Sequence, residues 1–181
     1  MSKIMKRIAW AATAIAIFCT IFYINTKNGP ALTLAITFGT ISYHFVMRLV
    51  VGYIIDFWLN NHVDYQKSWF QVGDAEQAFY KKLRVKKWKG KMGTYDPDSF
   101  DPGIHTWEEI AQATCQAELV HETIMVLSFV PVLASCLFGE LFVFVVTSGL
   151  AACFDAMFVI MQRYNRPRIK KLVEREKANR L

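Results

Sequence analysis

Apolar and charged residues occupy separate long blocks of this 181-residue sequence. Four blocks are almost entirely apolar and cover residues 8–25, 31–58, 117–138 and 141–162. Each block approaches or exceeds the roughly 20 residues that a helix needs to cross the hydrocarbon core of a bilayer. The amphipathic helices of a water-soluble globule would instead mix apolar and charged residues within each turn. The sequence therefore predicts an all-α, polytopic membrane protein with four transmembrane helices.

The composition excludes two other classes of protein. With 54% hydrophobic residues, the chain would collapse rather than stay disordered. A small disulfide scaffold is excluded because Cys19, Cys115, Cys136 and Cys153 show no paired spacing. We expect these cysteines to be reduced and to pack as small apolar residues.

The boundaries of the blocks predict one membrane domain over residues 1–181. The first span follows basic residues, as in a signal peptide, but lacks a small-residue cleavage site, so we expect an uncleaved anchor. Residues 59–106 hold no span and predict a basic, aromatic cytoplasmic loop. A capping-box pattern at Thr106 and Glu109 predicts the start of the third helix, and Pro131 predicts a kink in it.

Two further signals divide the end of the chain. Gly139 and Glu140 are the whole connection between the third and fourth spans, which predicts a tight turn. We expect Pro167 to break or kink the chain after the fourth span and to leave a basic C-terminal tail over residues 163–181.

Lys and Arg are distributed very unevenly. Of the 21, three precede the first span, eight lie between residues 60 and 106, and eight lie from residue 163 onward. With four spans these segments share one side, so the positive-inside rule places both termini in the cytoplasm and the chain in the cell membrane. The net charge of +6 then suggests contact with anionic lipids, and nucleic acid is not an expected partner.

Ionisable residues also occur inside the spans, where they are costly and mark functional sites by default. In the second span they recur at four-residue steps, and in the third at three- and four-residue steps, so each set lies on one helical face. The rise of 1.5 Å per residue puts His44, Arg48 and Asp155 about 20–26 Å from the outer surface. We predict one polar layer made of His44, Arg48, Glu118, His121 and Asp155, with Asp56 and Glu122 on the same helical faces.

Each of these residues also has a structural interpretation. Arg48 and Asp155 suit an ion pair that locks two helices, and a lone His44 suits packing. Glu118 and Glu122 suit the solvated end of an emerging helix.

The spacing Glu118-x-x-His121 is more specific, because a carboxylate one turn away can orient an imidazole and raise its basicity. We therefore interpret His121 as a general base and Glu118 as its partner. Metal-binding bundles use this spacing on two helices, so no metal is expected here.

Two basic segments suit recognition of phosphate or carboxylate. Residues 80–92 alternate basic with aromatic and apolar side chains, including Lys86, Lys87 and Trp88, and suit either a lipid surface or a phosphorylated donor. Residues 162–169 place three arginines around a Tyr-Asn pair and a proline, and Arg presents a planar donor fork. No nucleotide-binding motif is present.

Three stretches together carry a family resemblance: residues 85–91, residues 117–121 and residues 162–169, which include Arg-Tyr-Asn-Arg-Pro-Arg. In this order and spacing the sequence resembles the glycosyl-4,4′-diaponeurosporenoate acyltransferases, small integral-membrane enzymes, over roughly residues 65–170. The resemblance implies transfer of a fatty acyl group to a sugar hydroxyl of a glycosylated carotenoid. It also implies that Glu118, His121 and the arginines belong to a shared core.

The leading hypothesis is a membrane acyltransferase with no bound cofactor and an acyl-CoA or acyl-carrier thioester as co-substrate. The expected partners are membrane lipids and a glycolipid or isoprenoid-glycoside acceptor. The catalytic candidates are His121 and Glu118, with Arg48 a further candidate for stabilising the oxyanion. The substrate-binding candidates are His44, Arg48, Glu122, Asp155, Arg163, Tyr164, Asn165, Arg166, Arg168, Lys86, Lys87 and Trp88.

Two alternatives stay open at this point. One is another lipid-modifying reaction, such as methyl transfer to a headgroup, and the other is a non-enzymatic accessory subunit of a membrane complex. The acceptor, the acyl length and the oligomeric state do not follow from the sequence.

Overall fold

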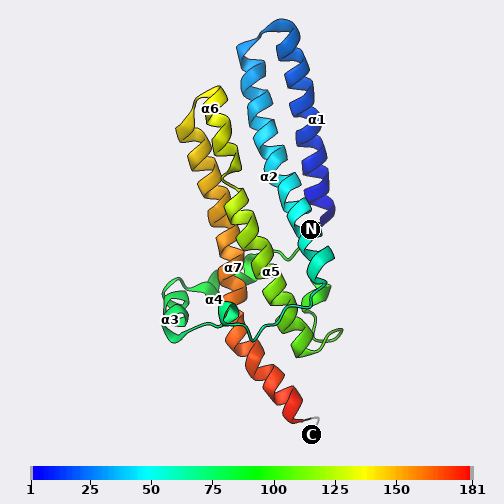
Figure 1. Cartoon of the computed structure of the whole chain (residues 1–181), viewed down its shortest axis with the longest axis vertical. Coiled ribbons are helices and arrows are strands. Elements are labelled where there is room, and N and C mark those ends of the chain that lie inside the picture. Colours follow the sequence, from blue (N-terminus) through cyan, green and yellow to red (C-terminus); the bar gives the residue numbers. More distant parts are fainter. Residues whose placement is uncertain (1, 180–181) are drawn as a thin grey trace.

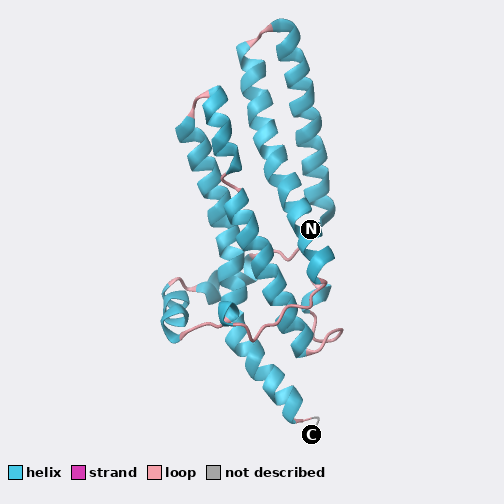
Figure 2. Cartoon of the chain, viewed as in Figure 1, coloured by secondary structure: helices cyan, strands magenta, loops and turns pink. Residues whose placement is uncertain are grey.

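A computed structural model describes residues 2–179, and every regular element in that range is a helix (Figure 2). The long helices are α1 (Ser2–Thr26), α2 (Gly29–Leu59), α5 (Trp107–Leu127) and α7 (Leu141–Ala178). Shorter helices are η1 (Ser68–Phe70), α3 (Asp74–Lys82), α4 (Val85–Trp88), η2 (Lys89–Lys91), η3 (Asp98–Phe100), η4 (Val130–Ala134) and α6 (Ser135–Phe138). Four segments, with α5 to α6 counted as one, are long and apolar enough to cross a membrane. The predicted fold class is thus confirmed.

The long helices form two antiparallel hairpins (Figure 1). In the first, the side chain of Asn28 accepts a hydrogen bond from the Ala31 amide at 3.2 Å and caps α2, with Pro30 in the first turn. The second hairpin turns at Gly139 and Glu140, whose φ angles are 74° and 55°, as the predicted tight turn requires. Both turns lie at one end of the molecule, whereas residues 60–106 and the end of α7 lie at the other.

The third span is interrupted where the sequence predicts a kink. Pro131 has no amide hydrogen, so the carbonyl of Leu127 loses its helical partner and α5 ends there. The Tyr43 hydroxyl of α2 donates to this carbonyl at 2.8 Å. The freed carbonyl therefore becomes a link between the two hairpins.

The described part of the predicted basic tail continues helix α7. Pro167 lies inside the helix, which continues to Ala178. Packing holds the chain helical beyond the proline, because Ile169 and Val173 lie in a core cluster with Ile110 of α5. Glu176 also accepts a hydrogen bond from the Trp107 amide at 3.0 Å and so covers an unpaired donor at the start of α5.

The buried face of α7 explains its contact with α5. Its buried residues recur at steps of three, four or seven, which keeps them on one stripe. They are Phe144, Ser148, Ala152, Asp155, Gln162, Arg166, Ile169 and Val173. Polar residues thus occupy the packed stripe itself.

The segment 60–106 folds against the second hairpin. Val63, Tyr65 and Phe70 join the same core cluster as α5 and α7. The predicted capping box is confirmed, with the Glu109 amide donating to Thr106 Oγ1 at 3.2 Å and the Thr106 amide donating to Glu109 Oε2 at 2.8 Å. This packing sets the position of the loop relative to the polar layer.

Large apolar side chains remain exposed along the helices. Leu137 is 82% exposed, and Trp10 and Phe142 are each 78% exposed. Lipid chains can cover such faces, whereas water would drive association through them. The four described cysteines are free, with Cys19 and Cys115 buried and Cys136 and Cys153 exposed.

Candidate functional site

Three helices contribute to a cluster of His121, Asp155 and Arg48, called here the His121 cluster. His121 Nδ1 lies 3.0 Å from Asp155 Oδ1, and Arg48 Nη2 donates to Asp155 Oδ2. The Asp155 side chain is 2% exposed, whereas that of His121 is 22% exposed. The carboxylate is therefore held from both sides while the imidazole stays partly accessible.

The imidazole of His121 is also fixed by an aromatic ring. Its plane lies 4° from that of Phe158, with ring centroids 4.4 Å apart. With Nδ1 as the donor to Asp155, Nε2 carries the free lone pair. Among residues 2–179, Nε2 has no hydrogen-bond partner. This is the arrangement of an oriented base with an open reactive nitrogen.

His44 lies one turn from Arg48 on α2, and Arg48 Nη1 donates to the His44 carbonyl at 2.9 Å. Both ring nitrogens of His44 are buried without a partner in the described chain. An unpaired buried polar group costs about 1–3 kcal/mol, so a ligand that pairs with it gains that interaction. Each terminal nitrogen of Arg48 thus forms one hydrogen bond within the protein, to the His44 carbonyl and to Asp155.

Glu118 does not contact His121, which corrects the predicted pairing. Its two oxygens accept from Arg163 Nη1 at 2.6 Å and Arg166 Nη1 at 2.5 Å. We call Glu118, Arg163, Arg166 and Glu76 the Glu118 cluster. Glu118 is 0% exposed and Arg166 1% exposed, so the ion pair between them is buried.

The antiparallel hairpin explains the exchange of partners. Because α5 and α7 run antiparallel, a later turn of α5 packs against an earlier turn of α7. Glu118 therefore faces Arg163 and Arg166, whereas His121 faces Asp155 and Phe158. Spacing on one helix therefore placed both residues on a common face but did not decide their contacts.

Arg163 joins the loop to the hairpin. It donates to Glu76 of α3 at 2.5 and 3.0 Å and to the carbonyls of Trp69 and Gln71 at 2.9 and 3.2 Å. Its hydrogen bonds lower the pKa of Glu76. Burial, with the hydrogen bond to Glu76, raises the pKa of Tyr80 to about 12. Arg163 is thus fully engaged inside the protein and is not free to bind phosphate.

The remaining predicted substrate-binding residues are of two kinds: some form contacts within the protein, and the others are free to contact a ligand. Lys89 donates to Asn165 Oδ1 at 2.5 Å and lies 4.9 Å from the centroid of the Tyr164 ring. Burial, with Arg168 and Lys86 nearby, lowers the pKa of Lys89. Tyr164 and Asn165 therefore hold the basic loop against α7.

Four other candidates lie around this contact. Trp88 Nε1 donates to the Leu83 carbonyl at 3.1 Å. Lys86, Lys87 and Arg168 are exposed, and none forms a hydrogen bond or ion pair with any other described residue. Of the cations predicted to bind substrate in these two motifs, these three remain available to an external anion.

Glu122 lies beside the Glu118 cluster rather than in the His121 cluster. One oxygen accepts from Trp69 Nε1 at 3.1 Å. Glu122 thus tethers the loop to α5, and Asp56 acts similarly at the end of α2, where it accepts from Gln116 Nε2 at 3.0 Å. Among residues 2–179 no group of three or more His, Cys, Asp and Glu is arranged to hold a metal ion.

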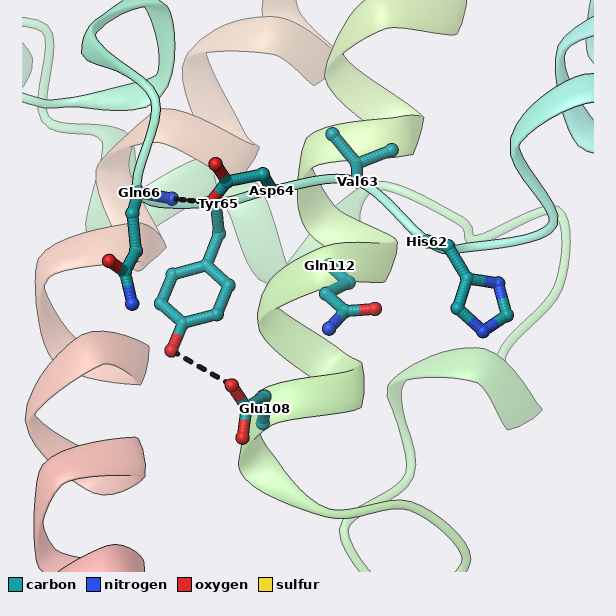
Figure 3. Close-up of a pocket in the computed structure, with 7 residues that line it drawn as sticks. All are labelled: His62, Val63, Asp64, Tyr65, Gln66, Glu108 and Gln112. Atoms are coloured by element: carbon teal, nitrogen blue, oxygen red, sulfur yellow. Dashed lines mark hydrogen bonds between the residues drawn. The ribbon is translucent and has the colours of Figure 1, made fainter.

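A pocket of about 300 Å³ lies between the start of the loop and α5. Tyr65 and Glu108 point toward each other, with the hydroxyl donating at 3.2 Å, while the His62 ring points away from this pair (Figure 3). Glu108 also accepts from Lys177 at 2.9 Å. The carboxylate is thus occupied, and the pocket lacks the oriented base found in the His121 cluster.

Three residues that form these contacts were not among the predicted site residues: Glu76, Phe158 and Lys89. Glu76 and Phe158 carried no signal, because a single acid in a loop and an aromatic in a span are both common. Lys89 stood within the basic run of residues 81–91, but nothing in that run distinguished it from its neighbours. Only the tertiary packing of the loop against α7 selects them.

Comparison with known proteins gives one match. The family model described as glycosyl-4,4′-diaponeurosporenoate acyltransferase matches residues 62–175. No curated protein and no solved structure matches the chain. The matched range contains the whole Glu118 cluster together with His121 and Asp155, and it leaves out α1 and α2.

Proposed function

Because the chain belongs to the glycosyl-4,4′-diaponeurosporenoate acyltransferase family, we propose that it transfers a fatty acyl group to a sugar hydroxyl of a membrane-embedded glycosylated carotenoid. The acyl donor is a thioester, either acyl-CoA or an acyl carrier. The single observation that carries the assignment of the site is the contact of His121 Nδ1 with Asp155 at 3.0 Å.

In this proposal His121 is the general base. Nε2 takes the proton of the acceptor hydroxyl as its oxygen attacks the thioester carbonyl carbon. The thiolate then leaves and takes this proton from Nε2, which yields an ester and a free thiol. Asp155 stabilises the transient imidazolium, as the carboxylate does in a Ser-His-Asp triad.

Arg48 acts on the base through Asp155 and is a positioning residue. Its contact with one oxygen of Asp155 leaves the other oxygen directed at His121. Glu118 has a structural role in this proposal, because both of its oxygens are already bound.

The two substrates approach from different surroundings. The exposed apolar faces of the helices suit an acceptor whose isoprenoid tail stays in the bilayer. The basic end formed by residues 60–106 and the end of α7 suits an anionic donor from the cytoplasm, which agrees with the positive-inside rule.

The test is acyl transfer by the full chain reconstituted in liposomes with a glycosylated carotenoid and radiolabelled acyl-CoA. We expect His121→Ala to lower turnover by about 10²–10⁴-fold, the usual contribution of a general base. His62→Ala, a change of the same kind at an exposed loop histidine, is the matched control and keeps its activity. Normal acyl transfer by His121→Ala would exclude this mechanism.

Two additional measurements separate the other functions. A radiolabelled methyl donor in the same liposomes distinguishes methyl transfer from acyl transfer. An accessory subunit would need a stoichiometric partner, so acyl transfer by the purified chain alone excludes that function.

A further inference from the structure

A second pocket, of about 250 Å³, lies where the loop after η1 meets the C-terminal part of α7. It is more than three turns along α7 from Asp155. Its lining combines cationic, polar and apolar side chains: Gln71, Val72, Arg166, Pro167, Lys170, Lys171 and Glu174. The mechanism proposed above uses none of these residues.

The pocket is lined by a buried arginine that has one donor without an acceptor. Arg166 is 1% exposed, and its Nη1 and Nη2 donate to Glu118, to the Phe70 carbonyl and to Thr114. Its Nε–H has no partner in the described chain. A buried guanidinium N–H without an acceptor is costly, so an anion that reaches it would be bound.

Two lysines add positive charge at the opening. Lys170 Nζ donates to Gln71 Oε1 at 2.5 Å, and Lys171 is exposed with no partner in the described part of the chain. Glu174 is the one acidic side chain in the lining. Since Glu118 neutralises Arg166, the two lysines exceed the single carboxylate, and the pocket favours an anion.

We propose that this pocket binds a phosphate group of the thioester donor, through Arg166 Nε and the lysines. Arg166 lies eleven residues from Asp155 along α7, which corresponds to roughly 17 Å of helix. In CoA and in acyl carriers the thioester is separated from the phosphates by the long pantetheine arm. A donor held by its phosphate here can therefore present its thioester to His121.

The identity of the donor rests on the proposed function, whereas the anion site does not. An anionic lipid headgroup carries the same phosphate chemistry. The experiment therefore offers CoA and an anionic lipid to the pocket in separate arms.

In the first arm, the full chain in phosphatidylcholine nanodiscs is titrated with CoA by calorimetry. In the second, native mass spectrometry counts phosphatidylglycerol retained from mixed nanodiscs. We expect Lys171→Glu to weaken binding of at least one probe by on the order of tenfold, the loss of one charged hydrogen bond. Glu174→Gln should tighten binding of the same probe.

Arg175→Glu is the matched control, because it makes the same charge change at an exposed position of α7 outside the lining. The arm that responds identifies the source of the phosphate. The proposal is overturned when Lys171→Glu and Arg175→Glu bind both probes equally. His121-dependent acyl transfer in that case would leave the proposed function intact and remove only the pocket.

Discussion

The Glu118 cluster and the His121 cluster lie one turn apart on α5, yet they differ in how many of their hydrogen-bonding atoms have partners. Glu118 is fully buried, and both its oxygens are bound by arginines. His121 keeps one ring nitrogen open and 22% of its side chain exposed. Nearby His44 has no partner at either ring nitrogen in the described chain.

This difference separates a structural role from a chemical one. The buried charges around Glu118 fix the loop and the hairpin, and both Glu118 oxygens are already bound, so Glu118 has no oxygen free to act on a substrate. An oriented base with an open nitrogen can still exchange a proton.

The largest effect is expected on turnover at Asp155. Asp155→Asn removes the charge that stabilises the imidazolium and permits the wrong tautomer of His121, so turnover should fall by about 10²–10⁴-fold. The rate of acyl transfer in liposomes measures this. Turnover should fall much less in Asp56→Asn, which makes the same change at a carboxylate outside the His121 cluster. Equal losses for the two variants would contradict the role of Asp155.

The next effect is on stability at Glu118. Glu118→Gln leaves Arg166 buried without its counter-charge and should cost about 3–5 kcal/mol of unfolding free energy. Thermal unfolding in detergent checks this, with His121→Gln as the comparison that changes stability less. A Glu118→Gln protein that is stable but has lost all turnover would instead show that Glu118 has a catalytic role.

An acid-side loss of stability should follow from Glu76. Its pKa is lowered in the folded protein, so its contribution is present above the unfolded pKa and is lost as the pH falls through the lower, folded pKa. The decline therefore begins below its ordinary value of 4.5. The melting temperature across this range should fall less steeply in Glu76→Gln. An identical pH profile in that variant would contradict the role of Glu76.

The smallest effect on stability is expected at His44. His44→Phe removes an unpaired polar ring and should leave the melting temperature unchanged or raise it, while turnover falls if the ring contacts the acceptor. Tyr43→Phe is its matched partner, because it deletes the bond to the Leu127 carbonyl and should cost about 1 kcal/mol. A large loss of stability in His44→Phe alone would show that the ring is structural.

The sequence was sufficient for the features that depend on local pattern. Hydropathy located the four spans, and side-chain chemistry identified the cap at Thr106 and the turn at Gly139. The ion pair of Arg48 and Asp155 was among the interpretations, and the two charges were expected in the same half of the membrane.

Contacts between helices could not be predicted from local sequence patterns. The register of α5 against α7 assigns Asp155 rather than Glu118 to His121, and the register follows from packing along the whole hairpin. Pro167 indicated a helix end, but the packing of Ile169 and Val173 outweighs its local preference. Which face is cytoplasmic stays a prediction from the charges.

The ion pair that joins α2 to α7 also has a consequence for biosynthesis. Arg48 and Asp155 are 107 residues apart in the chain, so the first hairpin leaves the ribosome long before Asp155 is made. At typical rates of synthesis this interval is roughly 5–20 s. An arginine inside a membrane helix is costly while it has no counter-charge. The first hairpin therefore waits in the membrane in a less stable form until the second arrives, and its insertion is completed only by the last helix of the chain.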